Sequence, residues 1–245
     1  MTFVLSIVAL VALVFAVSVH FNAKKQKAKL LQLKQAEFIR TYKWPAGLFD
    51  KLAKIHPSFK RKESALVSRG LRQFFVAYLM SGNKYVSMPS QAADDLWHEF
   101  ILFTRDYDSF CKDAFGGFLH HTPAVVLAEG QKSSNEGLRR VWWYACKYDN
   151  LDPRNPTRLP LLFALDAKLN IRGGYKYHPN CQALRDKGVA GAQCGGDFSS
   201  SSYDGSTSGF GDSGSVSSDS SSGDSSSSDS SGSDGGGGGC GGGGD

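Results

Sequence analysis

The two ends of the chain lack most kinds of charged residue. The first 23 of the 245 residues contain no Asp, Glu, Lys or Arg. The last 49 residues, 197–245, contain eight Asp but no Lys, Arg or Glu, so their net charge is −8. Because the whole chain carries +5, residues 1–196 carry +13. This division argues against a plain soluble enzyme, and a hydrophobic content of 41% argues against a wholly disordered chain.

The chain also lacks a disulfide framework. It has five cysteines, an odd number without compact spacing, which argues against a disulfide-stapled mini-protein and weakly favours a reducing compartment.

Most familiar catalytic motifs are absent. His98-Glu99 opens like a metalloprotease helix, but Leu102 stands where the second histidine is needed. No P-loop, no GxGxxG after a strand and no GxSxG elbow occurs. We therefore predict no cofactor-binding loop, and the sequence leans against an enzyme without excluding one.

Residues 2–21 form an uninterrupted apolar run, TFVLSIVALVALVFAVSVHF. About 20 such residues match the roughly 30 Å hydrocarbon core of a bilayer. We therefore predict a transmembrane anchor over residues 1–23, rather than a cleaved signal peptide, because Met1-Thr2-Phe3 lacks basic residues. Lysines follow at once, which predicts a single-pass protein of the inner or plasma membrane with most of its chain in the cytoplasm.

The middle of the chain has helical periodicity and no sustained alternation of period two. We predict an all-α fold with a basic helical stalk over residues 24–43 and a compact globular domain over residues 44–196. Helices are expected between Pro45 and Pro57 and over residues 62–80, 90–115, 123–129, 136–145 and 158–168.

The helix expected over residues 90–115 carries unusual polar residues. Asp94 and Asp95 lie four and three positions before His98, so either carboxylate can reach the imidazole. Such a pair can orient a basic or metal-bound histidine, and it can equally be a buried hydrogen bond that locks helix packing. Asp95, His98 and Cys111 are therefore the candidate catalytic residues, with thiol catalysis by Cys111 resting on composition alone.

Histidines and cysteines that suit zinc recur after this helix. His178 and Cys181 form a His-x2-Cys pair, and soft thiolate and imidazole ligands favour zinc. Cys194 follows thirteen residues later, while His120 and His121 lie on a turn after a double glycine. The candidate zinc ligands are His98, His120, His121, His178, Cys181 and Cys194, and the alternative is that no metal binds.

The basic charge suggests partners but no specific module. Lys24, Lys25, Lys27 and Lys29 could contact anionic lipid next to a membrane bound through residues 2–21, or could serve only to set orientation. We do not expect nucleic acid as a partner, because no recognised nucleic-acid module accompanies the charge.

A cluster of residues resembles the glycine-rich domain-containing proteins. It includes Met88-Pro89-Ser90-Gln91 and Asp95-Leu96-Trp97-His98-Glu99-Phe100, then Thr104, Tyr107, Phe110-Cys111, Phe115-Gly116 and His120-His121. The resemblance spans residues 38–196, is closest to bacterial members, and implies no established activity. Plant relatives imply links to stress responses and RNA binding. It directs attention to Asp95, Trp97, His98, Tyr107, Cys111, His120 and His121.

Residues 197–245 form a low-complexity tail. They contain 20 Ser and 15 Gly, a composition that cannot offset the entropy of ordering, so we predict disorder. Together these features favour a membrane-anchored interaction or scaffolding module with an unknown protein partner. The alternatives are a metal-dependent or thiol enzyme that uses Asp95, His98, His120 and His121, and a basic lipid- or RNA-binding module.

Overall fold

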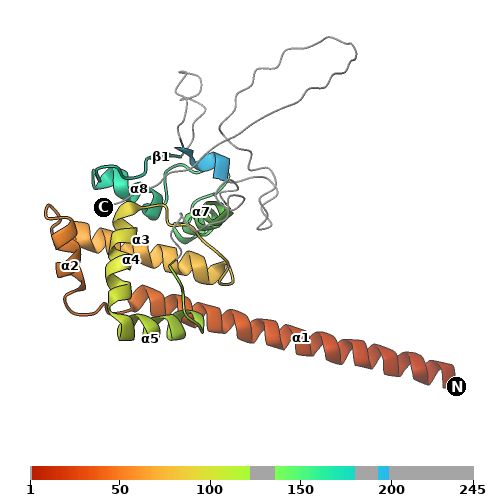
Figure 1. The fold of residues 1–245 in the computed structure, drawn as a ribbon. Coiled ribbons are helices and arrows are strands. Elements are labelled where there is room, and N and C mark those ends of the chain that lie inside the picture. Colours follow the sequence, from red (N-terminus) through yellow and green to blue (C-terminus); the bar gives the residue numbers. More distant parts are fainter. Residues whose placement is uncertain (1, 122–135, 180–192, 199–245) are drawn as a thin grey trace, which may run out of the picture. The chain divides into compact units, whose positions relative to one another are not determined.

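A computed structural model describes residues 2–121, 136–179 and 193–198, without the side chains of residues 2, 4–9, 12, 193, 194, 196 and 197 (Figure 1). Within these residues the chain forms seven α-helices, which confirms the predicted all-α class. They are α1 (Thr2–Thr41), α2 (Leu48–Ile55), α3 (Arg61–Met80), α4 (Gln91–Leu102), α5 (Thr104–Phe115), α7 (Glu136–Tyr148) and α8 (Leu161–Lys168). The two-residue strands β1 (Tyr177–His178) and β2 (Gln193–Cys194) pair in parallel, and the 3-10 helix η2 (Gly195–Phe198) follows.

Helix α1 corrects the predicted membrane topology. Among the residues that the structure describes, no helix combines the length and the apolar character that crossing a bilayer requires. The prediction of a single-pass membrane protein with a transmembrane anchor is therefore contradicted.

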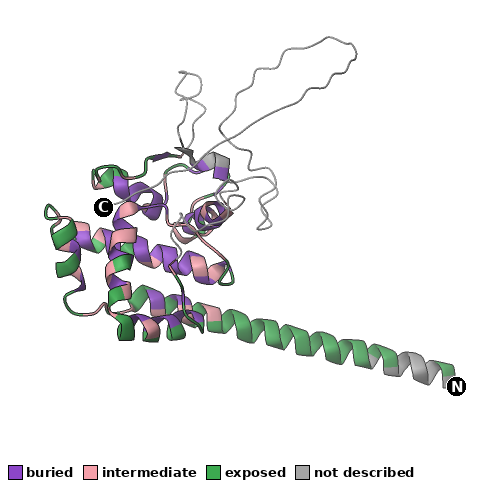
Figure 2. Cartoon of the chain, viewed as in Figure 1, coloured by how far each residue is buried: buried purple, intermediate pink, exposed green. Residues whose placement is uncertain are grey.

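Helix α3 forms the centre of the folded body. It contacts α1, α4, α7 and α8, and Figure 2 shows it buried along most of its length. Leu71, Phe74 and Phe75 are completely buried because apolar residues recur on several sides of this helix rather than in one stripe. A helix that is apolar on several sides is stable only when other helices surround it.

The predicted helix over residues 90–115 is two helices. The backbone of Phe103 has φ −82° and ψ 62°, which ends α4 and starts α5 in a new direction. The turn lets Phe110 of α5 pack against the end of α1, where its ring centroid lies 5.9 Å from that of Phe38 and 4.7 Å from that of Tyr42, the residue after α1. A straight helix would not bring Phe110 to α1, so burial of this aromatic cluster outweighs helical continuity.

The start of α4 is held by residues on two elements. Ser90 caps the helix, because its Oγ accepts from the backbone N–H of Ala93. Asp166 of α8 accepts from Ser90 Oγ (2.7 Å) and from the backbone N–H groups of Gln91 (2.8 Å) and Ala92 (3.2 Å). The buried carboxylate thus satisfies donors that a helix N-terminus leaves unpaired.

The core extends beyond the predicted domain boundary at residue 196. Phe198 is buried and packs against Trp142, Phe163 and Tyr177. The predicted helix over residues 123–129 and the predicted disorder of residues 199–245 lie outside the described residues, as do Cys181 and Cys240.

Candidate functional site

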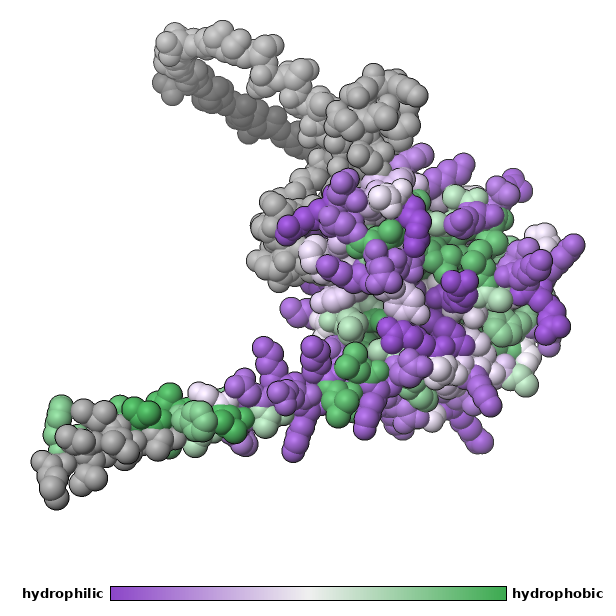
Figure 3. Space-filling model, turned by 180° about the vertical axis from the view of Figure 1, so that it is seen from behind, coloured by the Kyte–Doolittle hydropathy of each residue, from purple (hydrophilic) through white to green (hydrophobic). Residues whose placement is uncertain are grey.

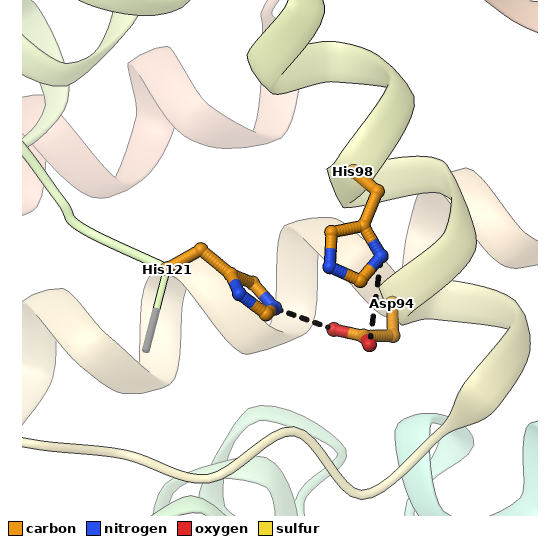
Figure 4. A group of neighbouring side chains, drawn as sticks. All are labelled: Asp94, His98 and His121. Carbon is orange, nitrogen blue, oxygen red and sulfur yellow. Dashed lines mark hydrogen bonds and ion pairs between the residues drawn. The ribbon is translucent and has the colours of Figure 1, made fainter. Parts of the chain in front are cut away.

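Asp94, His98 and His121 converge on one point beside α4 (Figure 4). Asp94 Oδ1 lies 3.0 Å from His121 Nε2, and Asp94 Oδ2 lies 3.7 Å from His98 Nδ1. Asp94 and His98 are one turn apart on α4, so the helix itself places them on the same face. His121 comes from the segment after α5, so only the tertiary fold brings it to the pair. One carboxylate therefore faces two imidazoles.

The site lies at the boundary between core and solvent. The side chains of His121 and Asp94 are 17% and 24% exposed, whereas that of His98 is 51% exposed. The ring of His121 also contacts the rings of Trp97 (4.5 Å between centroids) and His98 (4.3 Å). Asp94 lies in the first turn of α4, where the helix dipole favours a negative charge. His121 and Asp94 are therefore largely enclosed by the protein, whereas His98 faces solvent.

The three side chains could hold a metal ion. One ligand atom from each lies within 4.8 Å of the other two. Ligand atoms about 2.1 Å from a tetrahedral metal lie roughly 3.4 Å apart, so small side-chain movements would close the arrangement. Two imidazoles and one carboxylate form a ligand set used by zinc and by other divalent transition metals.

Asp95 belongs to a different pair from the predicted one. Its Oδ2 lies 2.8 Å from Nε2 of His56, the residue that follows α2, and its Oδ1 accepts from Gln91 Nε2 at 3.0 Å. Asp95 thus links α2 to α4, while Asp94 is the carboxylate that faces His98. Sequence reasoning did not select His56, because its partner is 39 positions away and no local spacing signals the pair.

A comparison with family profiles places this region in a known family. The match covers residues 34–198, which are 165 of the 245 residues. The chain belongs to the UCP032817-like family. The predicted membership of the glycine-rich domain-containing proteins is therefore wrong, because the matching profile is that of another family. No curated protein matches the chain. No solved structure matches it either.

The boundaries of the UCP032817-like region agree with the packing. The match begins in α1 just before the buried residues Ala36 and Ile39, and it ends at the buried Phe198. The candidate site lies wholly inside the matched region. Residues 13–31 of α1, which are exposed, lie outside it.

The other predicted metal ligands of the UCP032817-like domain are not gathered at this site. His120 is exposed, and its ring contacts Phe118 rather than His98. His178 is exposed on β1, where its backbone pairs in register with Cys194 of β2. The side chain of Cys194 and the whole of Cys181 lie outside the described residues. Among described residues, His98 and His121 are therefore the predicted ligands that come together.

The described cysteines of the domain are poorly placed for thiol chemistry. Cys111 and Cys146 are free and fully buried. Burial raises the pKa of both thiols, that of Cys146 to about 12, so the reactive thiolate is disfavoured. The hydroxyl of Tyr107 and the backbone of Leu119 lie against Cys111. This environment gives no support to a thiol enzyme.

The basic residues before the UCP032817-like region lie on an exposed helix. Lys24, Lys25, Lys27 and Lys29 are all exposed on α1. Figure 3 shows hydrophilic side chains along this part of α1, next to the apolar side chains nearer its start. The predicted contact of these lysines with anionic lipid stays a prediction.

Proposed function

We propose that this chain is a metal-dependent protein that binds one divalent transition-metal ion through Asp94, His98 and His121. The observation that supports this proposal is the convergence of the three ligand atoms within 4.8 Å. Nitrogen and carboxylate ligands of this kind favour zinc, and the same set suits iron or manganese.

The chemistry of the ligand set favours a metal over a purely structural contact. A structural aspartate needs one histidine partner to lock packing, but Asp94 faces two. His98 contributes little to the core, since half of its side chain is exposed, so packing alone does not explain its position. A metal ion between the three side chains would be coordinated by all of them.

Three protein ligands leave coordination positions for water or substrate. Sites with three ligands and an open position are typical of catalytic zinc, whereas structural zinc sites have four protein ligands. The exposed side of His98 would leave the open position facing solvent. A bound ion there would supply Lewis-acid chemistry and a water molecule that ionises near neutral pH. The proposed class of function is therefore metal-assisted hydrolysis or hydration.

Metal analysis of the full chain tests the proposal. After dialysis against Zn²⁺ and removal of excess ion, we expect one equivalent of zinc in the wild type and its loss in Asp94→Ala, His98→Ala and His121→Ala. His120→Ala is the matched control, because it removes an exposed neighbouring histidine that contacts Phe118 instead. Metal-free wild type, or full retention of zinc by both His98→Ala and His121→Ala, would refute the proposal.

A second candidate function is that of an interaction module. The first part of α1 exposes several large apolar side chains, including Leu13 and Phe15, which are 62% and 70% exposed. Contiguous exposed apolar surface of this kind is typical of sites that bind partners. Sedimentation of the full chain tests it, because self-association that Leu13→Glu and Phe15→Glu abolish would support α1 as the interaction segment. A monodisperse monomer of unchanged solubility in all three proteins would count against self-association.

A further inference from the structure

We infer that Tyr107 is a positioning residue for the metal site, and that it acts on His121 through the backbone of Leu119. The inference rests on the proposed function, because it assigns a role only if His121 is a ligand. Tyr107 lies on α5 and belongs to neither the ligand set nor the Asp95 pair.

The hydroxyl of Tyr107 joins three elements. It donates to the backbone carbonyl of Leu119 at 2.5 Å, and it accepts from the indole Nε1–H of Trp97 at 3.1 Å. Trp97 and Tyr107 are both almost completely buried. A buried hydroxyl with both a donor and an acceptor partner has a single favoured orientation. The backbone of Leu119 is therefore held at a defined distance from α4.

The segment that carries His121 depends on this attachment. Residues 117–121 form no helix or strand, so no secondary-structure ladder fixes their position. Their side chains alternate, with Phe118 and His120 exposed while Leu119 is buried and His121 is largely buried. In extended chain, residues two apart point to the same side. Holding Leu119 against the core therefore turns His121 towards Asp94.

Trp97 supports the same histidine from the other side. Its ring contacts that of His121 with 4.5 Å between centroids and an angle of 63°. Trp97 lies between Asp94 and His98 in sequence, so α4 carries two of the three ligands together with this support. The donor to Tyr107 and the ring that faces His121 are therefore parts of one side chain. Partners that orient a ligating histidine commonly change metal affinity by about 10- to 100-fold.

Titration of the full chain with Co²⁺ tests the inference, because the visible spectrum of Co²⁺ reports ligand geometry as well as affinity. For Tyr107→Phe, which keeps the ring and removes only the hydroxyl, we expect the affinity to fall by about 10- to 100-fold. We also expect an altered Co²⁺ spectrum at saturation. Tyr177→Phe is the matched control, because Tyr177 is a buried tyrosine that packs on Phe163 and Phe198. It should keep both the affinity and the spectrum of the wild type.

Each outcome separates this inference from the proposed function. If the wild type binds Co²⁺ and Tyr107→Phe binds it equally well with an unchanged spectrum, the positioning role is wrong while the metal site stands. If the wild type binds no metal, the proposed function fails and the inference fails with it. If Tyr107→Phe does not fold, Trp97→Phe decides the question, because it removes the donor to Tyr107 and retains a ring beside His121. Wild-type affinity and spectrum in Trp97→Phe would then overturn the inference.

Discussion

Replacing Asp166 by Asn tests the connection that places the start of α4. The buried carboxylate accepts four hydrogen bonds, with Oδ1 bound to Ser90 Oγ and the N–H of Ala92. Its Oδ2 accepts from the N–H groups of Gln91 and Tyr175. Asparagine has nearly the same volume, but in either orientation its NH₂ group faces at least one backbone N–H that needs an acceptor. An unsatisfied buried donor costs about 1–3 kcal/mol, and loss of the charge weakens the other bonds. We therefore expect the free energy of unfolding to fall by about 2–4 kcal/mol.

Equilibrium unfolding in urea measures this change. The m value, which is the dependence of the free energy of unfolding on urea concentration, should be the same for the wild type and the variant. Asp108→Asn is the control, because Asp108 forms an exposed pair with Lys112 one turn away on α5. Exposed pairs of this kind contribute little, so we expect a change under about 0.5 kcal/mol. If Asp166→Asn were as mild as Asp108→Asn, the argument that Asp166 holds α4 would be refuted.

Three further predictions follow from burial, packing and the ligand set. At about pH 8, iodoacetamide should modify Cys111 and Cys146 only after urea is added, because burial disfavours their thiolates. The raised pKa of Cys146 also implies a contribution to the free energy of unfolding. This contribution is complete below about pH 8.5 and is lost as the pH rises towards about 12. Peptide mass mapping that found either thiol modified in the native protein would contradict this. Gly195→Ala should lower the free energy of unfolding by about 1–3 kcal/mol, because the added Cβ would overlap the ring of Trp142. Gly117→Ala should be nearly neutral in the same urea assay, because nothing lies within 4 Å of its Cβ position. Finally, Co²⁺ affinity should fall as the pH is lowered, since protons compete with the metal ion for imidazole nitrogens. An affinity independent of pH would argue against histidine ligands.

Helical periodicity located most of the described elements. The predicted helix over residues 62–80 corresponds closely to α3, and the helix between Pro45 and Pro57 corresponds to α2. The cap of α4 is equally local, since Ser90 and Ala93 are three residues apart and their contact needs no other part of the chain. Such features depend on neighbours within one or two turns, which the order of residues specifies directly.

The break at Phe103 shows what periodicity could not reveal. Residues 90–115 contain no glycine or proline, so no local helix breaker distinguishes one long helix from two. The turn is decided by the burial of Phe110 against α1, whose residues lie about seventy positions earlier. The end of the core at Phe198 has the same origin, because its partners Trp142 and Phe163 come from α7 and α8.

The candidate site likewise combines contacts along one helix with contacts between separate elements. The spacing of residues along the chain was enough to place a carboxylate one helical turn from His98, because the α-helix fixes the geometry of residues four apart. It left both Asp94 and Asp95 as partners, since both lie within reach. The packing of separate elements distinguishes the two, because it places His56, which follows α2, beside Asp95 and brings His121 to Asp94. The reason is physical: contacts along one helix follow from its regular rise and turn, whereas contacts between elements follow from how the whole core buries its side chains.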